Sequence, residues 1–164
     1  MAGSKKKFYY NVAKVLHWFA GFFIAFNLLS GWRLGNFELE HRVILIMVHS
    51  GIGVTIFGLM LLRWWWRRRH NLYTPPRWWK RPSMLMQWIF YPLLLIQPLL
   101  GVALASVIDY EVRAFGFINF SALADDDTAM AQLALQLHGG LAIFLIGLVL
   151  VHGIERSRKA FSND

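Results

Sequence analysis

The 164-residue chain contains no cysteine. It can therefore form no disulfide, bind no iron–sulfur cluster or zinc ion through thiolates, and attach no haem covalently. Acidic residues are also scarce, with nine Asp and Glu against 17 Lys and Arg. Any redox or metal centre in this chain must be held by side chains other than cysteine.

Apolar side chains, in contrast, make up 57% of the residues. They fall in four runs of about 20, the length that crosses roughly 30 Å of hydrocarbon as a helix. Isolated strands cannot satisfy their backbone in lipid, and no ten-residue alternation repeats here. The sequence therefore predicts an all-α integral membrane four-helix bundle, built as a single domain from residues 1–164, with spans near 12–32, 43–62, 84–107 and 130–153. The first run is too long for the apolar part of a secretory signal, so we expect it to be a span.

The basic residues predict the orientation of the bundle. Most of them lie in the N-terminal segment, in the connection between the second and third runs, and in the C-terminal tail. The other two connections hold only Arg33, Arg42 and Arg113, and the last of them also carries Asp125, Asp126 and Asp127. The positive-inside rule then places both termini and the second connection in the cytoplasm, an N-in/C-in topology, and the acidic third connection in the periplasm.

The basic second connection is also rich in tryptophan, with Trp64–Trp66 and Trp78–Trp79 among its cations. A basic, aromatic segment can bind nucleic acid, but this one is bracketed by spans and forms no separate domain. An aromatic belt at the lipid headgroups explains the same composition. We therefore expect membrane lipid, and no nucleic acid, as a partner.

Four of the six histidines lie within the predicted spans: His17, His49, His138 and His152. A single histidine in a span is most simply explained by a hydrogen bond to a neighbouring helix. Ionisable side chains at that depth are costly, however, so four of them indicate a function.

The positions of these histidines predict two pairs. His138 and His152 are 14 residues apart, close to four helical turns, so they share one helix face and lie about 21 Å apart along the axis. With an N-in topology, His17 lies near the cytoplasmic end of the first span and His49 near the periplasmic end of the second. Each histidine of the fourth span thus has a partner at its own depth: His17 with His152, and His49 with His138.

Two facing imidazoles in a dry helix bundle, present twice, are what bis-histidine ligation of two haem b groups requires. Zinc or copper also binds imidazole, but two ligands without a nearby Cys, Asp or Glu make a poor zinc site. Haem supplies four equatorial nitrogens of its own. The alternative from another class is a non-redox, transporter-like bundle in which the histidines form a proton relay.

Glycines and cations surround the predicted sites. Glycines next to the histidines could let a flat ring approach the backbone, although small residues also serve helix contacts: Gly21, Gly51, Gly53, Gly139, Gly140 and Gly153. Arg63 is the cation that we assign to cofactor binding, and other candidates for the haem propionates are Lys14, Arg156, Arg33, Arg42 and Arg113. We expect His41 and His70, in the connections, to be solvated or interfacial, with His41 a weak candidate for proton handling.

Short segments along nearly the whole chain resemble one known family. They are Leu16–Trp18, Val48–Gly51, Leu61–Arg63, Tyr73–Pro76, Pro98–Gly101, Phe115–Gly116, Leu137–His138 and Val151–His152. This set resembles the bacterial cytochrome b561 family, which is similar in turn to the cytochrome b subunits of nickel–iron hydrogenases and formate dehydrogenases. The spacing of the histidines is the most specific part of the likeness.

The resemblance implies a bacterial inner-membrane bundle with two b haems, one near each face, and ubiquinone as an electron partner. We therefore predict an oxidoreductase that moves electrons between a periplasmic donor and the quinone pool. Some family members look like superoxide oxidases, but Asp125–Asp127 would repel an anionic donor unless nearby arginines dominate. The second possibility is a cytochrome b anchor subunit of a membrane dehydrogenase or hydrogenase. The sequence leaves open the donor, the direction of flow, and the presence of a homodimer or a partner redox subunit.

Overall fold

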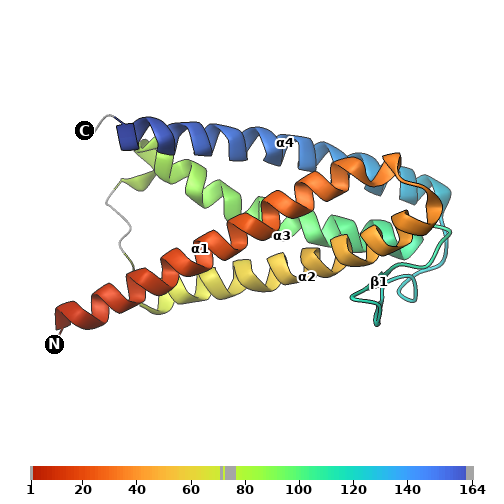
Figure 1. Ribbon diagram of the computed structural model, residues 1–164, viewed down its shortest axis with the longest axis horizontal. Coiled ribbons are helices and arrows are strands. Elements are labelled where there is room, and N and C mark those ends of the chain that lie inside the picture. The colour runs from red at the N-terminus through yellow and green to blue at the C-terminus, as the bar shows by residue number, and fades with distance from the viewer. Residues whose placement is uncertain (1, 71, 73–76, 162–164) are drawn as a thin grey trace.

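The computed structural model describes residues 2–70, 72 and 77–161 and consists mainly of four long helices (Figure 1). These are α1 (Ala2–Arg33), α2 (Leu39–Arg69), α3 (Pro82–Val107) and α4 (Thr128–Phe161). Each of the four is long and apolar enough to cross a membrane. This confirms the predicted all-α membrane bundle.

The connections differ in length and structure. A 3-10 turn, η1 (Leu34–Asn36), joins α1 to α2, and a second, η2 (Trp78–Lys80), precedes α3. Between α3 and α4 the chain forms a small antiparallel hairpin of β1 (Arg113–Ala114) and β2 (Ile118–Asn119). Both termini lie at the left of Figure 1, which we call the termini end, and the hairpin lies towards the other end, the hairpin end.

The helices begin and end differently from the predicted spans in one informative place. We placed Trp64–Trp66 in the second connection, but α2 continues through them to Arg69. Arginine is a good helix former, and a helix can continue into the headgroup region with its own hydrogen bonds intact. The third predicted span, 84–107, agrees with α3 to within a turn. The Tyr73–Pro76 segment of the family resemblance lies outside the described residues.

The start of α4 is fixed by Asp127. Its side-chain Oδ1 accepts hydrogen bonds from the backbone N–H groups of Ala129 (2.9 Å) and Met130 (3.0 Å), the usual role of an N-cap aspartate. The backbone N–H of Asp127 also donates to the carbonyl of Val107 at the end of α3 (3.0 Å). The hairpin-end termini of α3 and α4 are therefore tied at one level.

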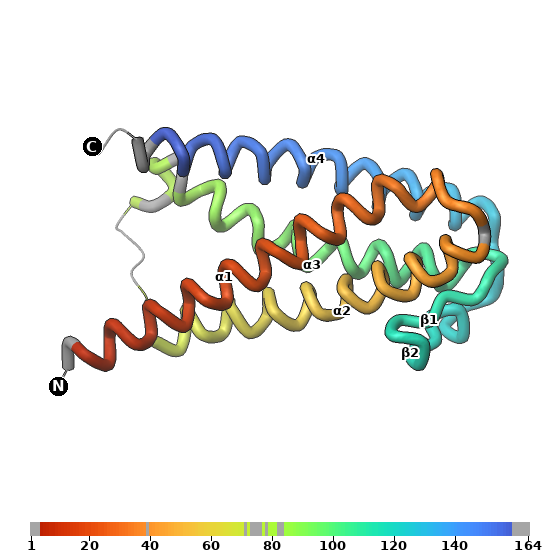
Figure 2. Tube along the Cα trace, in the orientation of Figure 1, coloured from red at the N-terminus to blue at the C-terminus, as the bar shows by residue number. Residues whose placement is uncertain are grey.

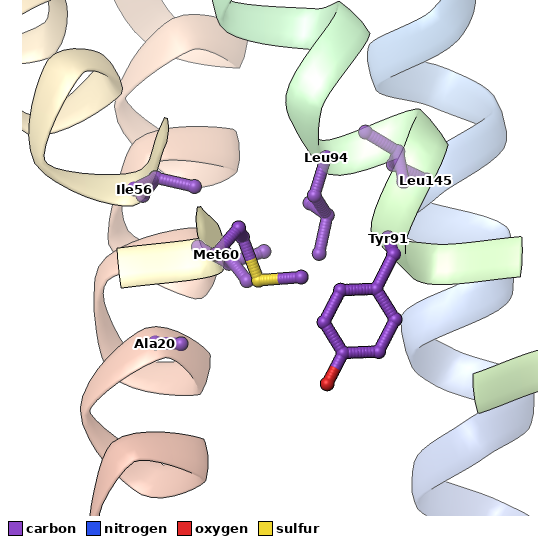
Figure 3. Packing of buried hydrophobic residues seen from close by; sticks show 7 residues of the cluster. Ala20, Ile56, Met60, Tyr91, Leu94 and Leu145 are labelled. Atoms are coloured by element: carbon purple, nitrogen blue, oxygen red, sulfur yellow. The ribbon is translucent and has the colours of Figure 1, made fainter. Parts of the chain in front are cut away.

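Neighbouring helices pack in chain order, α1 on α2, α2 on α3 and α3 on α4. Buried side chains from all four helices meet halfway along the bundle, in what we call the mid-bundle cluster (Figure 3): Ala20, Ile24, Ile56, Met60, Tyr91, Leu94 and Leu145. On α4, Leu145 lies seven residues from both His138 and His152. The cluster therefore lies between the two predicted histidine pairs. Large apolar side chains cover much of the outside, as lipid contact requires, among them Trp18, Phe22 and Leu29.

Candidate functional site

The structure brings the four histidines of the spans together as two pairs. The ring centroids of His17 (α1) and His152 (α4) are 6.1 Å apart, and the ring planes are inclined by 81°. Those of His49 (α2) and His138 (α4) are 6.2 Å apart and inclined by 73°. These are the partners that the depth argument predicted. In both pairs the imidazole of α4 faces a histidine of another helix, and α3 contacts it as well, through Phe90 at His152 and Gln97 at His138.

The separation within each pair fits two ligands of one metal ion. An imidazole nitrogen binds a metal at about 2 Å, so two imidazoles on opposite sides of it have centroids about 6 Å apart. Within the described part of the chain, no group of three or more His, Cys, Asp or Glu side chains could hold a bare metal ion. Each pair thus offers two imidazole nitrogens, and a haem, which brings four ring nitrogens of its own, would complete the coordination.

The imidazole of His138 is oriented by Gln97 of α3. Its Nδ1 lies 3.1 Å from the Gln97 carbonyl oxygen, which can only accept, so Nδ1 carries the hydrogen. The side-chain amide of Gln97 donates to the His138 carbonyl (3.0 Å) and lies 3.4 Å from His138 Nε2. This tautomer puts the lone pair on Nε2, where a metal would have to replace the Gln97 amide contact, and Nδ1–H is held by a backbone carbonyl as in many metal sites.

His49 has a similar partner on α1. Its Nδ1 lies 3.3 Å from the hydroxyl oxygen of Ser30, and this hydroxyl donates to the carbonyl of Asn27 (3.1 Å). The two histidines of the hairpin-end pair are therefore both held at Nδ1 by the helix beside them.

Two glycines make room for these imidazoles. A Cβ added to Gly31 of α1 would lie 2.9 Å from Cε1 of His49, and one added to Gly101 of α3 would lie 3.1 Å from Cε1 of His138. Our sequence reasoning missed both, because it considered glycines adjacent in sequence to the histidines. Gly101 does end the family-like segment Pro98–Gly101, but the sequence alone does not place it against a histidine 37 positions away.

The glycines that we did single out differ in their surroundings, and an added Cβ on Gly53 would make an ordinary contact, 3.8 Å from Nδ2 of Asn27. Beside Gly21, Gly139, Gly140 and Gly153 no described atom lies within 4 Å of an added Cβ, which leaves space next to the helix backbone. Gly51 instead packs beneath the ring of Phe115, where an added Cβ would lie 2.7 Å from two ring atoms. Gly51 therefore serves a contact between helix and connection.

The termini-end pair has a different environment, with two cations close enough to interact electrostatically with both histidines. These are Arg63 of α2 and Arg156 of α4. The Arg63 guanidinium also lies 5.8 Å from the centroid of the Tyr91 ring. His17 Nδ1 is buried, and the described residues provide no hydrogen-bond partner for it. The positive charges of Arg63 and Arg156 would attract a cofactor with anionic substituents.

The cations at the hairpin end are partly engaged. Arg113 forms an ion pair with Glu111 (2.7 Å), and this hydrogen bond raises the pKa of the Arg113 guanidinium. Arg42 donates from Nη2 to the carbonyl of Phe37 (3.0 Å). Arg113 is therefore a weaker candidate for a propionate partner than the sequence indicated.

The two remaining histidines lie apart from the pairs. His41 is exposed in the first turn of α2 rather than in a connection. His70, which caps α2, is partly buried and stacks on Tyr9 at 3.9 Å between centroids, with Trp66 at 4.3 Å. These packing contacts place His70 with the aromatic residues Tyr9 and Trp66 at the termini end.

Four membrane-spanning helices enclosing imidazole pairs at two depths define a b-type cytochrome architecture. The family model of the prokaryotic cytochrome b561 matches residues 9–154. The chain belongs to the prokaryotic cytochrome b561 family. It is therefore a multi-pass membrane protein that binds haem b and transfers electrons. A search of curated proteins gave no match.

Proposed function

We propose that this protein is a di-haem cytochrome that carries electrons across the bacterial inner membrane, between a periplasmic donor and ubiquinone. The observation that carries the proposal is the repetition of one geometry. Two imidazole pairs have nearly equal ring separations, 6.1 and 6.2 Å, at two depths of one bundle. A single haem would leave one of these pairs without a role.

In this proposal His17 and His152 hold one haem b, and His49 and His138 hold the other. Haem supplies a one-electron carrier, while the chain supplies axial ligands, orientation and low polarity. At the hairpin end, partners at Nδ1 hold both rings, and Nε2 would be the atom that binds the haem iron. At the termini end, Arg63 and Arg156 are placed to bind the propionates of the haem.

The region between the two pairs supports electron transfer better than a proton relay. The two proposed ligands on α4, His138 and His152, are about 21 Å apart along the axis, a distance set by 14 residues of helix. The mid-bundle cluster fills the interval with side chains that are almost all apolar. A relay would need a chain of polar groups or water through this region.

The charges at the two ends bear on the electron donor. With the termini end in the cytoplasm, as the basic residues predict, the hairpin end faces the periplasm. There Glu111 engages Arg113, and Asp125–Asp127 are exposed. This distribution supports a neutral or cationic donor over an anion such as superoxide.

The test is haem stoichiometry in the purified, detergent-solubilised protein. We expect a reduced-minus-oxidised spectrum of b type and a ratio of two haems per chain. His49→Ala or His138→Ala should lower the ratio to one, and so should His17→Ala or His152→Ala, while the exposed His41→Ala serves as the matched control and keeps both. A wild-type ratio of one, or a colourless protein, would refute the di-haem proposal.

A further inference from the structure

The hairpin between α3 and α4 turns back along α2 instead of extending away from the bundle (Figure 2). The ring of Phe115 lies on Gly51 of α2, and an ideal Cβ on Gly116 would lie 3.2 Å from the sulfur of Met47. Ala114, between these contacts and the base of the hairpin, is completely buried. The turn of the hairpin is therefore packed against the side of a membrane-spanning helix.

The α2 residues that contact the turn lie deeper along the helix axis than Val43, the start of its apolar run. Met47 and Gly51 follow Val43, where that run begins, by four and eight residues. At about 1.5 Å per residue, they are about 6 and 12 Å deeper along the helix axis. A hydrocarbon core about 30 Å thick has leaflets of about 15 Å. The turn thus lies at the depth of acyl chains rather than of water.

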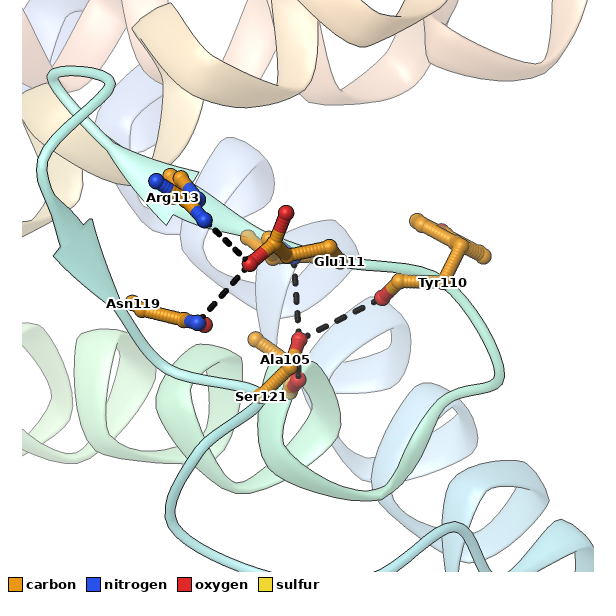
Figure 4. A network of polar contacts seen from close by, with 7 residues as sticks. Ala105, Tyr110, Glu111, Arg113, Asn119 and Ser121 are labelled. Atoms are coloured by element: carbon orange, nitrogen blue, oxygen red, sulfur yellow. Dashed lines mark hydrogen bonds and ion pairs between the residues drawn. The ribbon is translucent and has the colours of Figure 1, made fainter.

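The two ends of the hairpin match these two environments. At its base, Glu111 accepts hydrogen bonds from Arg113 (2.7 Å) and Asn119 (2.8 Å), as Figure 4 shows. At its turn, the stacked rings of Phe115 and Phe117 are 47% and 74% exposed. The hairpin is therefore polar where it would meet headgroups and aromatic where it would meet acyl chains.

Two backbone N–H groups of the turn are satisfied within the hairpin, which lowers the cost of a position in hydrocarbon. The N–H of Gly116 donates to the Arg113 carbonyl (3.3 Å), and that of Phe117 donates to the Ala114 carbonyl (3.2 Å). Phe115 and Gly116 both have positive φ, 53° and 82°, so the turn depends on two successive left-handed residues. The base is fixed to α3 by Ser121, whose hydroxyl accepts from the Val112 N–H (2.9 Å) and donates to the Ala105 carbonyl of α3 (3.2 Å).

We propose that the hairpin of residues 113–119 is a membrane anchor that inserts Phe115 and Phe117 among the acyl chains of the adjacent leaflet. The partner is lipid because the exposed rings continue the lipid-facing side of α2, where Val43 and Ile44 are also exposed. The connection between α3 and α4 is then partly embedded, and it holds the hairpin-end half of α2 from the side. This inference does not depend on haem.

Because the chain has no cysteine, a single label can report the depth of the turn. A nitroxide is attached to the cysteine of the Phe117→Cys variant, and the protein is reconstituted in vesicles of phosphatidylethanolamine and phosphatidylglycerol. The Leu123→Cys variant, labelled in the same way, is the matched control. Leu123 is 65% exposed in the same connection, beyond β2 and five residues before α4 begins at Thr128. Power saturation then compares access of oxygen, which concentrates in lipid, with access of a water-soluble nickel chelate.

We expect the label at position 117 to be several-fold more accessible to oxygen than to nickel, and the label at 123 to show the reverse. Nickel access at 117 equal to that at 123 would overturn the proposal, because the turn would then stand in water. Low access to both reagents at 117 would also overturn it, since protein, such as a second copy, would cover the turn. If labelling disturbs the fold, Phe117→Asp should destabilise the vesicle-bound protein more than Leu123→Asp, and equal effects would again overturn the proposal.

Discussion

Replacing Gly31 by alanine should disturb one histidine pair while leaving the other intact. The new Cβ would lie 2.9 Å from Cε1 of His49, whereas carbon atoms prefer about 3.5–4 Å, so the ring must move by about 0.6 Å or more. Functional sites tolerate displacements of about 0.5 Å. The movement also strains the 3.3 Å contact between His49 Nδ1 and Ser30. We therefore expect weaker haem binding at the hairpin end.

The stability change of Gly31→Ala is the difference of two effects. Overpacking in a filled site costs about 1–3 kcal/mol. Alanine in place of glycine within a helix stabilises the folded protein by about 1 kcal/mol. The net loss should be about 0–2 kcal/mol, small enough for the protein to remain folded and for its haem content to be measured.

Haem-to-protein ratio and low-spin ferric electron paramagnetic resonance check this prediction. Gly31→Ala should lose part of the hairpin-end haem or shift its signal, while the signal from the termini-end pair stays in place. Gly58 of α2 provides the control, because it is exposed and no described atom lies within 4 Å of an added Cβ. Full haem content with both signals unchanged in Gly31→Ala would show that the glycine does not position His49.

Two further substitutions test the termini end and the start of α4. Arg63→Gln should weaken binding of the termini-end haem about tenfold or more, since a hydrogen bond to a charged group contributes about 1.5–3 kcal/mol. Haem titration measures this change in affinity. An equal loss of affinity in Arg69→Gln would contradict the prediction. Asp127→Ala removes the acceptor for two N–H groups of α4, which should cost about 1 kcal/mol and lower Tm by about 2–4 °C. Thermal unfolding measures that shift, and a similar loss in the exposed Asp125→Ala would show that capping is not its cause.

The spans and the pairing of histidines could be predicted because both follow from one-dimensional spacing. Apolar runs set the helix lengths, and the 14-residue interval from His138 to His152 sets a shared face and two depths. The end of α2 could not be predicted, since Trp64–Arg69 suits both a helix and an interfacial loop. Gly31 is near His49 only because α1 packs on α2, so its role depends on how two helices meet.

The hairpin was the least predictable element. Its strands are two residues each, too short for a periodic pattern, and Phe115–Gly116 stood out only through the family resemblance. Its position against α2 depends on Gly51, which we had predicted to lie beside the haem ring. The structure instead shows the ring of Phe115 over that glycine.

The mid-bundle cluster has an electrical consequence. Met60 and Leu145 are almost completely buried in it, so hydrated ions and protons find little to solvate them between the two histidine pairs. An electron that crosses this layer without a compensating proton moves a full elementary charge through part of the membrane field. The field does work of about 2.3 kcal/mol on such a charge per 100 mV for complete passage. On the proposed di-haem route turnover would be electrogenic, and the membrane potential would favour one direction of electron flow over the other.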